Sequence, residues 1–203
     1  MGRLTVTEFV TLDGVAQGPG GSDEDRDGGF THGGWQVAMT DPEAARVVFE
    51  QASQMGALLL GRRTYEIFAG YWPNAPAEIP FTGLLNRVPK LVASRTLSDP
   101  LAWTGAEVLH GPLAESVASV KARYDEVHVI GSLGLVQSLL RSGLVDRLSL
   151  WLYPILLGSG KRVFAGGTVP TALRLSESQA YPNGTLHLIY DAAGVPTFAN
   201  RAG

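Results

Sequence analysis

The stretch from Ala57 to Glu66, ALLLGRRTYE, is the part of the chain that points most directly to a fold class. Its apolar run Ala57–Leu60 is short and continuous, which is typical of a strand buried on both faces. Gly61 ends the run, and the residues from Arg62 to Gly70 predict a helix that follows at once. A buried strand that leads directly into a helix is the repeating unit of an α/β sheet.

The same alternation recurs on both sides of this stretch. It predicts a mainly parallel central sheet with helices on both faces, a three-layer α/β fold. Near the C-terminus the pattern changes, because Asn183-Gly184 between two alternating runs is the strongest short hairpin signal. We therefore expect an antiparallel C-terminal hairpin. The predicted strands are 4–12, 57–60, 90–94, 107–109, 127–130, 147–153, 174–180 and 186–191, and the predicted helices are 41–54, 62–70, 81–87, 112–124 and 133–141.

Length and composition favour one soluble domain. The 203 residues predict a single domain over 1–203, with 192–203 as a loosely held tail. The net charge of −3 and the absence of a basic run argue against a nucleic-acid or membrane-surface partner. No stretch approaches the ~20 apolar residues of a membrane span, and no signal-peptide core follows the N-terminus. Without cysteine there are no disulfides or thiolate chemistry. We expect a cytoplasmic protein that acts on a small molecule.

A long glycine-rich segment, 13–40, separates the first strand from the first helix. So long a loop in a compact domain is usually functional, and this one is a candidate lid over a substrate. The alternative is a segment without fixed structure. Phe30, His32, Trp35 and Trp72 are the candidate substrate-binding residues, since the tryptophans can stack on a flat heterocycle. The alternative is that the aromatic side chains only anchor the loop to the core. His32 is a candidate proton donor or a solvent-facing bystander.

The same loop contains an acidic run that resembles the opening of a calcium-binding loop. Asp23-Glu24-Asp25-Arg26-Asp27-Gly28 has the D-x-D-x-D-G spacing. Position twelve is Gly34, however, where a bidentate glutamate belongs. A solvated acidic loop explains the run without a metal ion. The sequence therefore predicts no metal site, with calcium as the alternative.

Polar side chains and glycines follow the predicted strands where each strand ends. Because ligands bind at the carboxyl ends of parallel strands, these residues are candidates for one shared site. Helix N-termini, arginines and hydroxyls together suit a ligand with several phosphates. The alternative is that the glycines only allow turns and the arginines are solvated. The candidates are Gly61, Arg62, Arg63 and Thr64, then Ser94, Arg95 and Thr96, and finally Gly131 and Ser132.

These motifs together resemble the dihydrofolate reductase-like superfamily, and more narrowly the reductase domain of riboflavin biosynthesis and its stand-alone bacterial relatives. The resemblance covers about residues 3 to 191. Where the family often has paired glycines, this chain has Gly131-Ser132. The matching motifs are Thr11–Gly14, Gly61–Glu66, Lys90–Leu97, Ile130–Ser132, and the segments from Gly143 to Asp146 and from Pro154 to Phe164.

The resemblance implies a doubly wound fold with NADPH across the strand ends. It implies that Arg62, Arg63 and Thr64 contact the cofactor phosphates, and that Ser94 and Arg95 read the 2′-phosphate. It places Gly131 and Ser132 at the pyrophosphate and nicotinamide, and Asp13 near the nicotinamide end. Asp41 is the nearest counterpart of the acid that protonates the pterin in dihydrofolate reductases, although a helix cap explains it fully. Asp13 and Asp41 are the candidate catalytic residues.

The function expected from this resemblance is NADPH-dependent hydride transfer. The substrate is a small heterocycle or a phosphoribosylamino-pyrimidine of the 5-amino-6-(5-phosphoribosylamino)uracil type. Dihydrofolate reduction is a second option, and a non-catalytic nucleotide-binding protein is an alternative of another class. The pattern around Trp151, opposite in phase to Leu148, Leu150 and Leu152, suggests a strand covered on both faces. A homodimer and burial inside the monomer are equally compatible with it.

Overall fold

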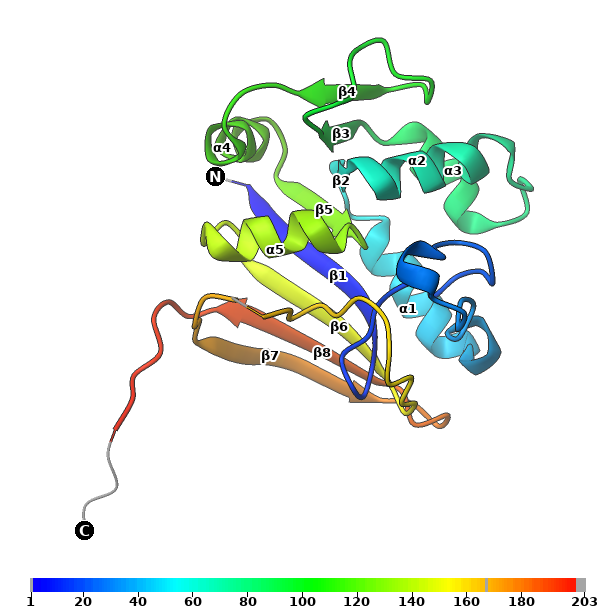
Figure 1. The fold of residues 1–203 in the computed structure, drawn as a ribbon, viewed down its shortest axis with the longest axis vertical. Coiled ribbons are helices and arrows are strands. Elements are labelled where there is room, and N and C mark those ends of the chain that lie inside the picture. Colours follow the sequence, from blue (N-terminus) through cyan, green and yellow to red (C-terminus); the bar gives the residue numbers. More distant parts are fainter. Residues whose placement is uncertain (1, 167, 200–203) are drawn as a thin grey trace.

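The computed structural model describes residues 2–166 and 168–199, which form one mixed sheet with helices against both faces (Figure 1). The order of the 8-stranded sheet is β4-β3-β2-β5-β1-β6-β8-β7. The strands from β1 to β6 pair in parallel, whereas β8 is antiparallel to β6 and β7. The predicted α/β class and the antiparallel hairpin are confirmed. The strands are β1 (Arg3–Thr11), β2 (Ala57–Gly61), β3 (Lys90–Ala93), β4 (Ala106–Leu109), β5 (Glu126–Ile130), β6 (Arg147–Tyr153), β7 (Leu173–Ala180) and β8 (Leu186–Ala192).

The helices begin and end close to the predicted residues. Asp41 caps the first of them, since its Oδ1 accepts hydrogen bonds from the backbone N–H groups of Glu43 (2.9 Å) and Ala44 (3.0 Å). Within residues 2–166 and 168–199, no helix is both long and apolar enough to cross a bilayer. The helices are α1 (Pro42–Ala52), α2 (Arg62–Tyr71), α3 (Pro80–Arg87), α4 (Leu113–Arg123) and α5 (Leu133–Arg141), with short 3-10 turns at Asp27–Gly29, Val37–Met39 and Trp72–Asn74.

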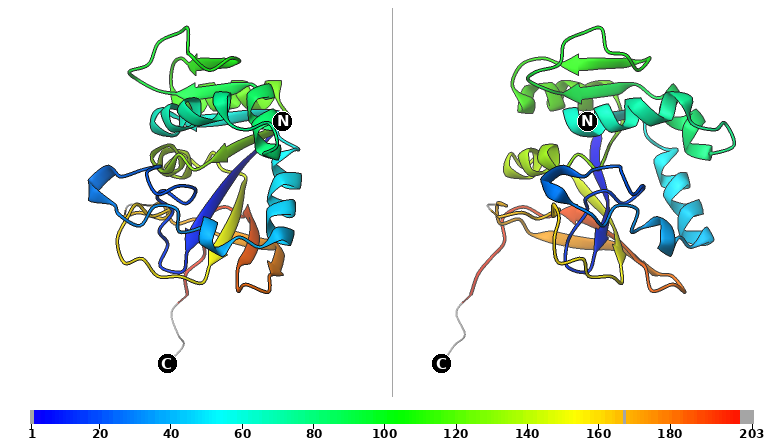
Figure 2. Two further views of the ribbon diagram at one scale, coloured as in Figure 1. Left: turned by 90° about the vertical axis from the view of Figure 1, so that its right-hand side faces the viewer. Right: turned by 45° about the vertical axis from the view of Figure 1, so that its right-hand side comes forward.

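The two faces of the sheet hold separate cores. Leu4 and Val6 of β1 pack with apolar residues of α4 and α5. On the other face, Leu58 and Leu60 of β2 pack with α1, α2 and α3. Figure 2 shows α1 and α5 on opposite sides of β1. Trp151 packs on the α1 side and Leu148 on the α5 side, so the predicted phase of β6 is confirmed.

The loop 13–40 is anchored to the core on the α1 side. Phe30 and Trp35 are buried beside Trp151 and Tyr153. The indole Nε1 of Trp35 donates a hydrogen bond of 2.9 Å to the Gln17 carbonyl. These aromatic side chains therefore hold the loop in place. At the other end of the chain, Ala193 and Gly194 are still hydrogen-bonded to Ala172, and residues 195–199 then run away from the sheet without helix or strand (Figure 1).

A buried histidine on the hairpin makes the fold sensitive to acid. His187 stacks on Trp151 with ring centroids 4.0 Å apart, and its Nε2 lies 2.9 Å from the Ser149 hydroxyl. Burial lowers the pKa of His187 to about 4, so protonation favours the unfolded chain. The free energy of unfolding is therefore expected to fall by up to about 1.4 kcal/mol per pH unit between pH 6.5 and 4.

The His187→Phe variant tests this prediction, because phenylalanine keeps a ring on Trp151 and cannot take a proton. Loss of the Ser149 contact lowers its stability equally at every pH. Urea unfolding between pH 7 and 4 is expected to show a shallower pH dependence for the variant than for the natural protein. Parallel pH profiles would contradict the assignment.

Candidate functional site

A cavity of about 1060 Å³ opens at the carboxyl ends of the parallel strands. Its position follows from the strand pairing. β1 pairs with β5 as far as Thr7 and Ile130, whereas β1 continues along β6 to Thr11 and Tyr153. β5 ends at Ile130, beside Thr7 of β1. From there the chain continues to α5 on one face of the sheet, whereas the chain after β1 continues to α1 on the other face, and a crevice lies between these two connections. Such switch points are where open α/β sheets bind ligands.

One part of the cavity, which we call the strand-end region, gathers the residues that follow β2, β3 and β5. Because these strands are neighbours or near neighbours in the sheet, their carboxyl ends meet. α2 and α5 both begin here and direct N–H groups toward the cavity mouth. Of the candidate cofactor-binding residues, only Thr96 lies outside the lining. The region is lined by Gly61, Arg62, Arg63, Thr64, Ser94, Arg95, Gly131 and Ser132, with Glu24, Asp25 and Lys161 at its borders.

The turn between β5 and α5 is strained and cross-braced. Ser132 has a φ of 59°, and it is the one non-glycine residue with a positive φ in the described part of the chain. Its Oγ accepts a hydrogen bond of 3.0 Å from the Gly61 backbone N–H. Its own N–H donates a 3.0 Å bond to Thr64 Oγ1. These bonds tie the ends of β2 and β5 together and hold a left-handed serine that costs about 1–2 kcal/mol.

The Ser132→Ala variant is expected to lower the free energy of unfolding by about 1–3 kcal/mol, because the Gly61 N–H loses its acceptor while the left-handed strain stays. Ser132→Gly loses the same bond but removes the strain, so its loss is expected to be smaller. Urea denaturation of both variants measures the difference. Equal losses would show that the left-handed serine stores no strain.

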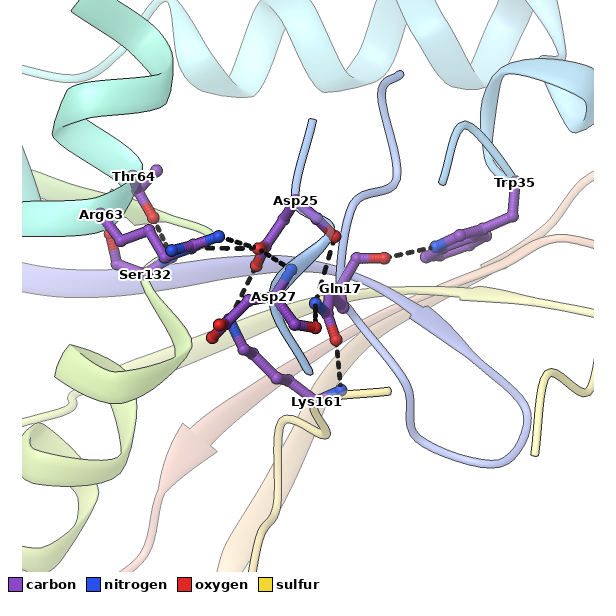
Figure 3. A network of polar contacts seen from close by, with 8 residues as sticks. All are labelled: Gln17, Asp25, Asp27, Trp35, Arg63, Thr64, Ser132 and Lys161. Atoms are coloured by element: carbon purple, nitrogen blue, oxygen red, sulfur yellow. Dashed lines mark hydrogen bonds and ion pairs between the residues drawn. The ribbon is translucent and has the colours of Figure 1, made fainter. Parts of the chain in front are cut away.

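An ion-pair network fastens the loop 13–40 over the strand-end region (Figure 3). Asp25 Oδ1 accepts hydrogen bonds from Arg63 Nε at 3.0 Å and Nη2 at 2.6 Å. Asp25 Oδ2 lies 2.8 Å from Lys161 Nζ, which also lies 2.8 Å from Asp27 Oδ2. These cations lower the pKa of Asp25, although burial opposes them. The carboxylates of the loop therefore already neutralise Arg63 and Lys161.

Gln17 braces the same loop from inside. Its Nε2 donates hydrogen bonds to the carbonyls of Asp25 (3.1 Å) and Asp27 (3.0 Å), and its Oε1 accepts one from the Lys161 N–H at 3.0 Å. Within the acidic run, Asp25 and Asp27 face the side chains of Arg63 and Lys161. Over 2–166 and 168–199, no three metal-ligating side chains come together. The loop forms a fixed wall of the cavity in this structure.

The second part of the cavity, the α1-side region, lies between the sheet and the helices α1, α2 and α3. Its walls are mostly apolar and aromatic. Trp72 meets Phe68 edge-on and lies 6.3 Å from Phe81, centroid to centroid. Asp41 lies here, at the N-terminus of α1. The region is lined by Gln36, Thr40, Asp41, Ala44, Ala45, Val48, Gln51, Ala52, Ile67, Phe68, Trp72, Phe81, Leu85, His128 and Tyr153.

The structure separates the remaining candidates from the cavity. Phe30 and Trp35 are buried in the core, and His32 is exposed against the edge of Phe30. Asp13 lies outside the lining and accepts hydrogen bonds from Thr11 Oγ1 at 2.6 Å and from the Gly158 N–H at 2.8 Å. These bonds lower its pKa to about 2. Asp13 thus fixes the loop after β6, whereas Trp72 and Asp41 do line the cavity.

Glu8 is a functional candidate that the sequence reasoning missed. It sits in β1, one residue beyond the last pair with β5, and borders the cavity. The side chain is 2% exposed, and within the described residues its Oε1 has no hydrogen-bond partner. Burial raises the pKa of Glu8 well above its ordinary value, because the charged carboxylate would lose its hydration, so the folded chain favours the protonated form. The only sequence signal for this role was a charged residue on a strand face whose other residues, at positions 4, 6 and 10, are apolar.

This fold is a doubly wound domain with a crevice at the carboxyl ends of its parallel strands, and the chain belongs to the RibD C-terminal domain family. The model of that family matches residues 3–187. The predicted family resemblance is confirmed. Among curated proteins, the uncharacterized protein YyaP of Bacillus subtilis (strain 168) is 24% identical over 192 residues, which is 93% of this chain and 94% of that protein.

Solved structures confirm the fold. A putative riboflavin biosynthesis protein from Shewanella sp. PV-4 has a TM-score of 0.73 at 19% identity, over 94% of this chain and 98% of that one. A pyrimidine reductase-like protein from Corynebacterium diphtheriae has a TM-score of 0.63 at 17% identity, over 94% and 92%. The Thermotoga maritima diaminohydroxyphosphoribosylaminopyrimidine deaminase/5-amino-6-(5-phosphoribosylamino)uracil reductase has a TM-score of 0.62 at 15% identity, over 95% of this chain and 57% of that one.

Proposed function

We propose that this protein is an NADPH-dependent reductase that transfers hydride to a small heterocyclic substrate. The observation behind the proposal is the strand-end region, where two helix N-termini, arginines and hydroxyls converge on one crevice. This donor set suits a ligand with several phosphates. Membership of the RibD C-terminal domain family supports the same activity, since a structural neighbour is named as a reductase.

Arg95 and Ser94 are the residues most available to bind the 2′-phosphate that NADPH has and NADH lacks. Arg95 is exposed, and none of the ion pairs within residues 2–166 and 168–199 involves it. The Ser94 Oγ accepts hydrogen bonds from the N–H groups of Thr96 (3.1 Å) and Leu97 (3.0 Å). Its own O–H can therefore point to an anion. By contrast, Arg62 pairs with Glu66 at 3.0 Å and Arg63 with Asp25 at 2.6 Å.

The reduction also needs a proton, because the atom next to the carbon that receives hydride gains one. NADPH supplies the hydride when it is bound. Glu8 borders the cavity one residue beyond the end of the pairing between β1 and β5, and burial favours its protonated form. Its side chain is in phase with Leu4 and Val6, so it approaches the crevice from the α5 face, across the unpaired edge of β1 from the α1-side region. We assign it the role of proton donor, with solvent restoring its proton after each turnover. The Asp41 carboxylate already accepts two backbone N–H bonds and so serves the helix first.

Calorimetric titration with NADPH and NADH, followed by turnover assays, tests the proposal. We expect micromolar NADPH binding and much weaker NADH binding. Oxidation of NADPH in the presence of heterocyclic acceptors then distinguishes a reductase from a nucleotide-binding protein without activity. If neither NADPH nor NADH binds, the assignment of NADPH as the cofactor is refuted.

A further inference from the structure

We infer that the substrate of this reductase is a flat heterocycle without a phosphate or carboxylate group. This inference rests on the proposed function, because it assigns the strand-end region to the cofactor and the α1-side region to the substrate. It departs from the phosphoribosylamino-pyrimidine that the family resemblance suggested. The charges that line the cavity and the cap of α1 support it.

Most cations of the cavity wall lie at the strand ends, with Arg62 and Arg63 in the first turn of α2. Arg62, Arg63, Arg95 and Lys161 border the strand-end region, and Arg141 lines the cavity at the far end of α5. Among the described residues that line the α1-side region, there is no lysine or arginine. His128 lines this region, but burial lowers its pKa, and it is neutral at neutral pH. A phosphorylated substrate would therefore place its dianion where no side chain balances the charge.

The N-terminus of α1 is the other feature that can bind an anion, and Asp41 already occupies it. Its carboxylate accepts the free N–H groups of Glu43 and Ala44. Pro42, at the first helical position, has no N–H to offer. Asp41 also borders the α1-side region, so it repels a second anion at close range. The helix end that would attract a phosphate is thus closed to it.

The remaining lining suits a flat, weakly polar molecule. Phe68, Trp72 and Phe81 supply aromatic surface, and their mutual edge-on and tilted contacts leave faces for a further ring. Gln51 and Thr40 add amide and hydroxyl groups at the border. Such groups can pair with ring nitrogens and exocyclic carbonyls. An uncharged or protonated heterocycle satisfies all of these surfaces.

The test compares matched ligands on the protein saturated with NADP⁺, so that the strand-end region is filled. The probes are riboflavin against its 5′-phosphate, uridine against its 5′-monophosphate, and 5-amino-6-ribosylaminouracil against its 5′-phosphate. Calorimetry is expected to find a pair whose unphosphorylated member binds at least about tenfold tighter. A pair whose phosphorylated member binds tighter would overturn the inference. Failure of all unphosphorylated probes to bind would overturn it as well.

A variant that keeps the helix cap but removes the charge sharpens the result. Serine is as good a cap as aspartate, so Asp41→Ser preserves α1. In this variant, the ratio between the affinity for the unphosphorylated probe and the affinity for its phosphorylated partner is expected to fall by about three- to tenfold. The control Asp23→Ser removes an exposed carboxylate outside the cavity and is expected to change nothing. An unchanged preference in Asp41→Ser would contradict the assigned role of Asp41. NADPH binding, measured separately, shows whether the proposed function itself has failed.

Discussion

The Arg95→Ala variant is expected to bind NADPH about 10- to 100-fold more weakly, while its NADH affinity changes little. A charge-assisted hydrogen bond to a phosphate contributes about 1.5–3 kcal/mol. Arg95 is the strand-end arginine without an ion pair among the described residues, so the whole contribution is available to a 2′-phosphate. Calorimetric titration with both nucleotides measures the change in selectivity.

Arg87→Ala is the matched control, since Arg87 is exposed at the end of α3 and lies outside the cavity lining. It is expected to leave both affinities unchanged. Equal weakening of NADPH and NADH in Arg95→Ala would place Arg95 on a phosphate common to both nucleotides. No change in either would remove Arg95 from the site.

The Glu8→Gln variant is expected to lose about 100-fold or more in kcat, because glutamine can donate a hydrogen bond but not a proton. It is also expected to be the more stable protein at neutral pH. The raised pKa of Glu8 means that the folded chain holds a proton which the unfolded chain releases above pH 4.5. The contribution of Glu8 to the free energy of unfolding therefore falls as pH rises above 4.5, opposite in sign to the contribution of His187.

Glu8→Gln lacks this dependence. The difference in unfolding free energy between the two proteins is expected to grow by about 1.4 kcal/mol per pH unit from pH 5 until the raised pKa is reached. Urea denaturation across pH 5–8, together with kcat, gives both readings. Loss of activity with loss of stability would indicate a structural role instead. Retained kcat would remove Glu8 as the proton donor.

The strand ends could be predicted from the sequence because their signals are local. Apolar runs such as Ala57–Leu60 mark buried strands, and glycine with polar residues marks where they end. The topology rule for parallel sheets then brings those ends together, as the lining from Gly61 to Ser132 shows. The start of helix α1 could also be predicted from the sequence, because the cap at Asp41 is a local pattern.

The remaining features depend on contacts between distant residues. Asp13 resembles a catalytic acid in sequence, but its partners Leu157 and Gly158 lie 144 and 145 residues away. Whether Trp35 stacks on a ligand or packs in the core depends on Trp151 and Tyr153, which no local pattern reveals. The burial of Glu8 depends on strand pairing with Leu150 of β6, which is distant in the sequence. The family resemblance supplied the cofactor expectation, and it gave no indication of Glu8.

Because Asp25 is ion-paired with Arg63, its carboxylate competes with a phosphate of the proposed cofactor for the same guanidinium group. On the proposed cofactor position, a phosphate oxygen reaches Arg63 only by sharing or displacing a carboxylate that lies 2.6 Å from the guanidinium. Association is then an exchange of one anion for another, and the observed affinity is the difference between two attractions. The displaced Asp25 is attached to the loop that forms a cavity wall. Cofactor arrival and loosening of that wall are thereby coupled events.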